Sequence, residues 1–220
     1  MIKGCIFDLD GTLLDSQWVW KSSTQELLEE LGIYNSQQVY ETIRSFSLDE
    51  AVNYIITTYH LKMTPAEVIN KVSNLVKSKY DYQVQLKTGA YEKLLQFKKE
   101  GKKMVIATAS EYEYIMPCLI RLKINELMEA VITTSQYSTN KREPLIYDKA
   151  TAIMQLKKEE VLVFEDALHA IETLKKFQYQ VCAIYEEEEK NNQLQIKQLA
   201  DIWIENWKDL DLSYIQSDNK

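Results

Sequence analysis

Two aspartates one residue apart, Asp8 and Asp10, follow a short apolar run near the start of the chain. Two carboxylates this close repel each other unless a cation or a shared proton relieves the repulsion, so their spacing indicates a metal site or an acid–base pair. Gly11 and Thr12 come directly after them, and the glycine permits the backbone conformation that a tight turn requires. Taken alone, the Asp-x-Asp spacing fits a surface turn at the end of a strand equally well.

A second pair of acids, Glu165 and Asp166, follows another apolar run far along the chain. Mg²⁺ prefers carboxylate and carbonyl oxygens in an octahedral arrangement and needs only a few protein ligands. Paired acids at the tips of two adjacent strands meet that requirement. By themselves Glu165 and Asp166 fit the start of a surface helix, with Asp at the N-cap, but beside Asp8 and Asp10 we favour a metal site.

Two further segments carry side chains that could bind a phosphate. Thr108, Ala109 and Ser110 follow an apolar run, and a hydroxyl together with the backbone N–H groups of a following turn can hold phosphate oxygens. Thr or Ser after a strand is also a common helix N-cap, so this segment is ambiguous by itself. Lys141 lies in a predicted loop, where a lysine is usually solvated, but an ammonium there could neutralise both a carboxylate nucleophile and an incoming phosphate.

The segments that must position these side chains are short apolar runs that alternate with helical patterns. Such alternation predicts βαβ units with right-handed crossovers, an open parallel sheet and an α/β fold. Because parallel strands place their carboxyl ends at one edge of the sheet, polar residues that follow separate strands can meet there. The predicted strands are residues 5–7, 104–108, 130–133, 161–164 and 181–185, with 202–204 as a sixth at the edge.

Residues 16–86 show a different pattern, with apolar residues at helical spacing and no convincing strand. Two capping-box patterns, Ser47–Glu50 and Thr64–Glu67, predict helix starts. We therefore expect four helices in this block. They would form a second domain, inserted between residues 1–15 and 87–220 of the α/β core.

Composition narrows the class of protein. The 220 residues are 45% hydrophobic and 27% charged, which suits one good core or a core plus an insert. The net charge of −7 and the lack of a basic stripe argue against a nucleic-acid-binding surface. The 3 cysteines are widely spaced among apolar residues and indicate buried thiols in a reducing compartment. With no run of membrane-spanning length and no signal-peptide layout, we expect a cytoplasmic protein without a membrane partner.

The run Phe-Asp-Leu-Asp-Gly-Thr-Leu-Leu-Asp that begins at Phe7 resembles the first motif of the haloacid-dehalogenase-like (HAD) phosphohydrolases. Thr108 with Ser110 matches their second motif, Lys141 the third, and Glu165–Asp166 the fourth. The resemblance covers essentially the whole chain, in order, including the length and helical character of the inserted block. It implies a Rossmann-like open parallel sheet with helices on both faces, and an inserted all-α helical-bundle cap domain.

The chain departs from the family pattern at two places. Arg142 and Glu143 separate Lys141 from the proline that usually follows it directly. His169–Ala170 stands where a glycine is frequent after the fourth motif. Neither departure touches a reacting atom, but both could alter the geometry of the phosphate-binding loops.

The resemblance implies that Asp8 attacks phosphorus and forms an aspartyl-phosphate, while Asp10 protonates the leaving oxygen and then deprotonates the attacking water. It implies Mg²⁺ as the cofactor, held by Asp8, the Asp10 carbonyl oxygen and Asp166, with Glu165 binding directly or through water. By position, the resemblance also implies that Thr108 and Lys141 are catalytic. It implies four phosphate-binding residues: Gly11, Thr12, Ala109 and Ser110.

For the cap, the resemblance implies closure over the site and substrate contacts from an inner surface around Gln17, Trp18, Trp20, Arg44 and Phe46. Trp18 and Trp20 could equally pack in the core of the cap. The expected partner is a small phosphorylated metabolite, with phosphoglycolate, sugar phosphates, nucleotides and pyrophosphate all open. We expect a monomer or a weak homodimer.

A Mg²⁺-dependent phosphatase acting on a small phosphomonoester is the favoured function. The main alternative is a phosphomutase similar to β-phosphoglucomutase, which carries a His in the first cap helix and an Arg in the cap loop. Trp20 and Leu48 stand at these places as nearly as they can be aligned, which disfavours the mutase. A dehalogenase would lack the carboxylate that Asp10 supplies. A phosphonatase would need a cap lysine for Schiff-base chemistry, and nothing in the pattern marks out the available Lys21 for that role. A non-catalytic binding protein on the same scaffold predicts a broken motif, and none of the four is broken.

Overall fold

The computed structural model describes residues 1–44 and 46–213. The chain divides into two compact units, one formed by Met1–Ser16 with Gln85–Lys220 and the other by Gln17–Val84. The first unit is α/β and the second is helical. The expected core range 87–220 runs past the described residues.

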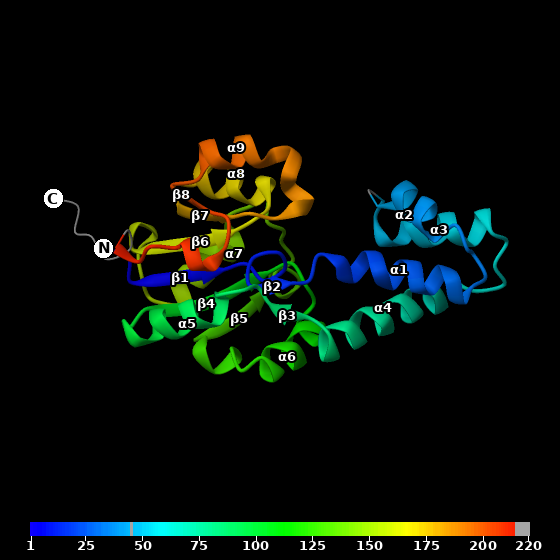
Figure 1. Cartoon of the computed structure of the whole chain (residues 1–220), viewed down its shortest axis with the longest axis horizontal. Helices are drawn as coiled ribbons and strands as arrows, with labels where there is room; N and C mark the ends of the chain where they lie inside the picture. Colours follow the sequence, from blue (N-terminus) through cyan, green and yellow to red (C-terminus); the bar gives the residue numbers. More distant parts are fainter. Residues whose placement is uncertain (45, 214–220) are drawn as a thin grey trace. The chain divides into compact units, whose positions relative to one another are not determined.

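Six parallel strands form one sheet in the order β5-β4-β1-β6-β7-β8 (Figure 1). The strands are β1 Gly4–Phe7, β4 Lys103–Thr108, β5 Ala130–Thr133, β6 Val161–Glu165, β7 Gln180–Ile184 and β8 Ile202–Ile204. Each predicted strand is confirmed to within one residue at either end. Phe7 at the end of β1 pairs with Ile106 of β4 on one side and with Phe164 of β6 on the other. The central strand β1 therefore ends beside the carboxyl ends of both neighbours.

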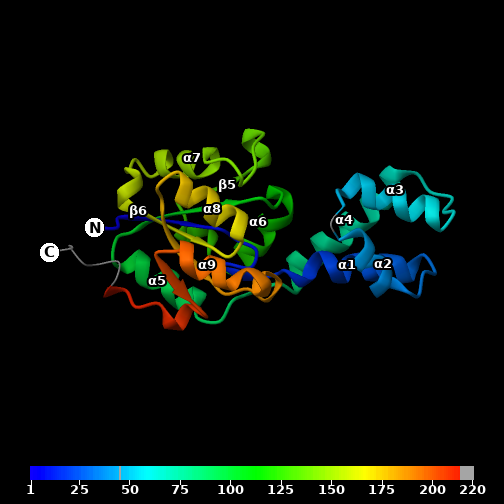
Figure 2. The same cartoon turned by 90° about the horizontal axis from the view of Figure 1, so that it is seen from above.

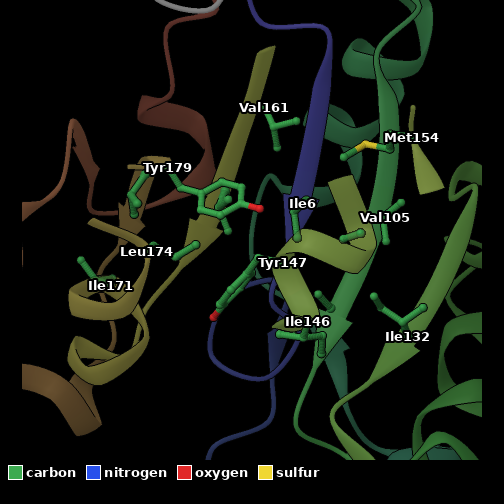
Figure 3. Close-up of a cluster of buried hydrophobic side chains, with 14 of the residues drawn as sticks. Ile6, Val105, Ile132, Ile146, Tyr147, Met154, Val161, Ile171, Leu174 and Tyr179 are labelled. Atoms are coloured by element: carbon green, nitrogen blue, oxygen red, sulfur yellow. The ribbon is translucent and has the colours of Figure 1, made fainter. Parts of the chain in front are cut away.

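Helices cover both faces of this sheet, as the α/β prediction requires; Figure 2 shows α7 and α5 on opposite sides of the strands. On one face, Tyr147 of α7 and Leu174 of α8 join Ile6 of β1 in a buried cluster, drawn in Figure 3. On the other face, the rings of Phe97 (α5) and Phe7 (β1) lie 6.0 Å apart. The helices of this unit are α5 Ala90–Lys99, α6 Tyr112–Arg121, α7 Leu145–Ile153, α8 Leu168–Lys176 and α9 Gln193–Leu199.

A two-stranded antiparallel ribbon, β2 Leu14–Asp15 with β3 Gln85–Leu86, lies where the chain leaves and re-enters the α/β unit. The prediction of no strand within residues 16–86 is therefore wrong at the last two positions. Two-residue strands are too short to show an alternating pattern, so periodicity could not reveal them. Short 3₁₀ segments complete the unit: η1 Asn125–Leu127, η2 Ser135–Tyr137, η3 Lys158–Glu160, η4 Glu187–Asn192 and η5 Trp207–Asp209.

The helical unit contains the four predicted helices, α1 Trp18–Glu30, α2 Ser36–Ile43, α3 Leu48–Thr58 and α4 Pro65–Tyr82. Both predicted capping boxes are present, because Ser47 and Thr64 each accept the backbone N–H of the glutamate three residues later at 3.3 Å. Buried side chains of α1, such as Leu27 and Leu28, hold the helices together. Among the described helices of the whole chain, none combines the length and apolar character needed to cross a bilayer.

Candidate active site

The carboxyl ends of β1, β4 and β6 meet at one edge of the sheet. The chain runs from β1 to β4 on one side, while β6 and later strands lie on the other, and open α/β sheets place ligands where the order reverses in this way. Asp8 follows β1, Thr108 ends β4, and Glu165 ends β6. The backbone N–H of Asp8 donates to the Phe164 carbonyl oxygen at 2.9 Å, which extends the strand pairing up to Asp8.

Lys141 lies between two of these carboxylates. Its ammonium contacts Asp8 Oδ1 and lies 2.6 Å from Glu165 Oε1. All three residues are buried, with Lys141 7%, Asp8 6% and Glu165 0% exposed. Burial by itself lowers the pKa of Lys141, but Asp8 and Glu165 outweigh it and raise that pKa above its usual value, so the side chain is charged at neutral pH.

Three carboxylates, which we call the acidic trio, come together at this edge: Asp8, Glu165 and Asp166. Each offers one oxygen atom, and these atoms lie within 4.8 Å of one another. Glu165 Oε2 is buried and has no hydrogen-bond partner among the residues that the structure describes. Lys141 offsets only one of the three negative charges. An unpartnered buried oxygen within an all-oxygen donor set suits a hard divalent cation such as Mg²⁺, so the residues present fit that ion.

Burial disfavours the ionised form of two carboxylates of the acidic trio, Asp8 and Asp166. Burial raises the pKa of Asp8 to about 6; Lys141 opposes this rise and Glu165 adds to it. Burial also raises the pKa of Asp166 well above its usual value, with further contributions from Asp8 and Glu165. The ionised forms of Asp8 and Asp166 are therefore disfavoured at this edge, and a divalent cation would favour them.

The Asp10 carboxylate is held by two hydroxyl groups. Ser16 donates to its Oδ1 at 2.6 Å and Ser110 to its Oδ2 at 2.5 Å. These bonds fix a carboxylate two residues from Asp8, at a site partly open to solvent. The proposed ligand role of the Asp10 carbonyl oxygen stays a prediction.

The turn after β1 brings Thr12 to the acidic trio. Gly11 has a φ of 83°, in the left-handed region that favours glycine, and its N–H donates to Leu14 at 3.0 Å. Thr12 is fully buried, and its hydroxyl donates to Asp166 Oδ1 at 2.7 Å. In this structure the Thr12 hydroxyl thus contacts a carboxylate of the trio, and contact with a phosphate stays a prediction.

The segment after β4 forms a compact turn. Thr108 is buried, and its Oγ1 accepts the backbone N–H of Ser110 at 3.1 Å. The N-cap of α6 is Glu111, which makes no side-chain capping bond, so neither hydroxyl of this segment caps the helix. Ala109 is exposed beside them.

In the helical unit, the predicted substrate residues Trp20 and Arg44 line one pocket of about 300 Å³. Its other lining residues are mainly apolar or aromatic: Thr24, Tyr40, Ile43, Phe46, Leu48 and Ala51. Trp20 is 40% exposed, so the interpretation of Trp20 as a core-packing residue does not describe its position.

Two residues that contact the site were missed in the sequence. Ser16 holds Asp10, and the hydroxyl of Tyr147 donates to Glu165 Oε1 at 2.8 Å. Tyr147 lies on the buried face of α7, where its spacing indicates only a core residue. The one available signal was the hydroxyl itself, because a buried tyrosine usually needs a hydrogen-bond partner.

The fold and the acidic trio together define an α/β enzyme with an inserted helical unit. Residues 5–184 match the family model described as haloacid dehalogenase-like hydrolase. The chain belongs to this family, and the predictions of the family, the fold class and an enzyme are confirmed.

The names of similar proteins denote more than one reaction. The phosphorylated carbohydrates phosphatase of Thermotoga maritima is 21% identical over 79% of this chain and 81% of its own length. The pyrophosphatase PpaX of Bacillus cereus is 25% identical over 77% of each chain. The β-phosphoglucomutase structure from Clostridium difficile has a TM-score of 0.72 at 18% identity, with 98% of this chain and 96% of that chain covered, which shows a shared fold.

Proposed function

We propose that this chain is a Mg²⁺-dependent phosphatase that hydrolyses a small phosphomonoester through an aspartyl-phosphate on Asp8. The observation that carries the proposal is the acidic trio, whose oxygens lie within 4.8 Å of one another, together with the Lys141 ammonium on Asp8 and Glu165. A phosphate dianion can approach a carboxylate only where positive charge offsets the repulsion. The Lys141 ammonium supplies part of that charge, and Mg²⁺ held by the trio would supply the rest. The phosphatase names of two relatives support the same reaction class.

In the first step, an oxygen of Asp8 forms a bond to phosphorus while the bond from phosphorus to the ester oxygen breaks. Asp10 gives its proton to that ester oxygen, and the alcohol leaves. In the second step, a water oxygen attacks phosphorus, the bond to Asp8 breaks, and Asp10 takes the proton of the water. Ser16 and Ser110 can hold Asp10 in both protonation states, because a hydroxyl either donates or accepts a hydrogen bond.

Asp8, Glu165 and Asp166 are the side chains that would hold Mg²⁺. When bound, the ion supplies positive charge beside the trio and the incoming phosphoryl group. Lys141 keeps Asp8 ionised and oriented by its contact with Oδ1. Thr108 and the backbone of Ala109 and Ser110 are our proposed phosphate contacts.

For the organic part of the substrate, we propose contacts with Trp20 and Arg44 in the pocket of the helical unit. A guanidinium and an indole suit a small phosphorylated metabolite that has both polar and apolar surface. We further propose a cytoplasmic enzyme without a nucleic-acid or membrane partner, active as a monomer or a weak homodimer.

The decisive experiment is a phosphate-release screen of purified protein over a metabolite panel, with Mg²⁺ and with EDTA. The panel contains phosphoglycolate, sugar phosphates, nucleotides and pyrophosphate. We expect hydrolysis of one or more monoesters with Mg²⁺ and at least about a 100-fold loss with EDTA, since the trio would regain its uncompensated charge. Undiminished hydrolysis in EDTA would contradict the metal requirement. Phosphoryl transfer that needs a sugar bisphosphate as primer would favour the mutase instead.

Replacing Trp20 tests the substrate pocket. For Trp20→Ala we expect kcat/KM for the preferred monoester to fall about 10- to 100-fold, mainly through KM, because a large apolar contact with the substrate is lost. Tyr82→Ala is the matched control, since Tyr82 is a 76% exposed aromatic of the same unit that does not line the pocket. Equal kinetics for the two variants would remove Trp20 from the proposed contacts.

A further inference from the structure

The two oxygens of Glu165 have very different surroundings. Oε1 accepts two donors, the Lys141 ammonium at 2.6 Å and the Tyr147 hydroxyl at 2.8 Å. Oε2 is buried with no hydrogen-bond partner among the described residues. Oε1 is thus fully occupied by protein donors, while the lone pairs of Oε2 accept no hydrogen bond from the described residues and could bind a cation.

Lys141 alone would not hold the Glu165 carboxylate with Oε1 toward its donors and Oε2 free of them. Its ammonium is shared with Asp8, and a single flexible donor lets a carboxylate turn about its terminal torsion, which has a broad, two-fold energy profile. Tyr147 adds a second donor on a rigid ring, and α7 holds that ring in the buried cluster of Figure 3. Two donors on one oxygen prevent the two carboxylate oxygens from exchanging places.

The hydroxyl of Tyr147 is a dependable donor. The side chain is fully buried, and its hydroxyl lies 2.8 Å from Glu165 Oε1, a carboxylate oxygen that serves as the acceptor, so the hydroxyl is the donor of this bond. The ring by itself would pack equally well as phenylalanine. The specific contribution of the hydroxyl is therefore its hydrogen bond to the Glu165 carboxylate.

We propose that Tyr147 is a positioning residue for the metal site: it holds Glu165 by Oε1 so that Oε2 is presented to Mg²⁺. This inference rests on the proposed function, because it requires the acidic trio to bind the ion. It assigns a role to a residue that lies outside the four sequence motifs. Groups that orient a metal ligand in this way usually affect metal affinity about 10- to 100-fold.

Tyr147→Phe is the test, and Mg²⁺ affinity measured by isothermal titration calorimetry is the readout. We expect the Kd for Mg²⁺ to rise about 10- to 100-fold. Tyr179→Phe is a matched control, because Tyr179 lies in the same buried cluster and the centroid of its ring is 6.1 Å from that of the Tyr147 ring. The Tyr179 hydroxyl contacts Thr151 and Asp148 instead of Glu165, so its removal should leave the Kd within about twofold.

Thermal unfolding in EDTA separates positioning from a merely structural role. Both variants lose a hydrogen bond and should show a modest fall in Tm, whereas only Tyr147→Phe should also lose part of the Tm increase that Mg²⁺ produces. If Tyr147→Phe does not refold, Tyr147→Met lacks the same hydroxyl and can fill the space with a flexible side chain.

The measured Mg²⁺ affinities decide whether Tyr147 positions Glu165 for the ion. An unchanged or tighter Kd for Tyr147→Phe, or an equal loss in Tyr179→Phe, overturns the inference while Mg²⁺ binding and turnover of the unaltered protein still support the proposed function. No Mg²⁺ binding by the unaltered protein overturns both.

Discussion

Asp8→Asn is expected to abolish turnover, with kcat lowered at least about 10⁴-fold, while the fold is retained. The amide is isosteric with the carboxylate but is a poor nucleophile toward phosphorus. The measurement is phosphate release with the preferred monoester at saturating Mg²⁺. Asp148→Asn is the matched control: Asp148 is a partly exposed aspartate of α7 that pairs with Lys158 at 2.8 Å, and its loss should change kcat by less than about twofold.

The stability of Asp8→Asn in EDTA gives a second readout. The pKa of Asp8 is about 6 in the folded protein, mainly because of burial, against an ordinary value of 3.8. A raised carboxyl pKa means that the ionised form destabilises the folded state above pH 6, and that this penalty fades as the pH falls from 6 to 3.8. The Asn variant should therefore be at least as stable as the unaltered protein at pH 8, with the difference shrinking toward pH 4. Substantial Mg²⁺-dependent turnover by this variant would refute Asp8 as the nucleophile.

Lys141→Met is expected to have the second-largest effect. Its ammonium is the one cation paired with Asp8 and Glu165 among the described ion pairs, so its removal leaves the acidic trio uncompensated. We expect kcat to fall about 100- to 1,000-fold, as is usual when a group that stabilises transferred charge is lost. In EDTA at pH 8, the free energy of unfolding should fall by about 3–5 kcal/mol, because removing one partner of a buried pair leaves buried charge behind.

The pH dependence of the stability of Lys141→Met distinguishes an electrostatic role of Lys141 from simple packing. The pKa of Lys141 is raised, so the ammonium stabilises the folded state throughout the neutral range and is lost only at strongly alkaline pH. In the Met variant, the destabilisation should diminish as acid protonates Asp8 and Asp166, whose pKa values are raised, and Mg²⁺ should restore part of the stability. The control is Lys158→Met, whose 39% exposed side chain makes a surface pair with a small expected effect. A stability loss that does not change between pH 8 and pH 5 would contradict the electrostatic role.

Much of this architecture was accessible from the sequence. Buried parallel strands are short apolar runs, and six of them could be located because each is bounded by polar segments. The acids directly after β1 and β6 then had to lie at one sheet edge, because parallel strands share the direction of their carboxyl ends. The capping boxes of α3 and α4 are equally local, since four consecutive residues contain the whole signal.

Other features depend on contacts between distant residues. The β2–β3 ribbon joins residues about 70 positions apart through backbone groups, which every amino acid supplies alike. Thr12 on Asp166 and Tyr147 on Glu165 are hydrogen bonds of buried side chains, and nothing in the local pattern separates a hydroxyl with such a partner from an ordinary core residue.

The sequence by itself therefore determined which chemical groups the α/β edge would carry, because strand direction and motif order are properties of the chain. Tertiary structure alone decided how those groups are held: which Glu165 oxygen takes Lys141 and Tyr147, which stays without a partner, and which hydroxyls hold Asp10. The physical reason is range, since hydrogen bonds and ion pairs act over a few ångströms and exist only after packing has brought remote segments together.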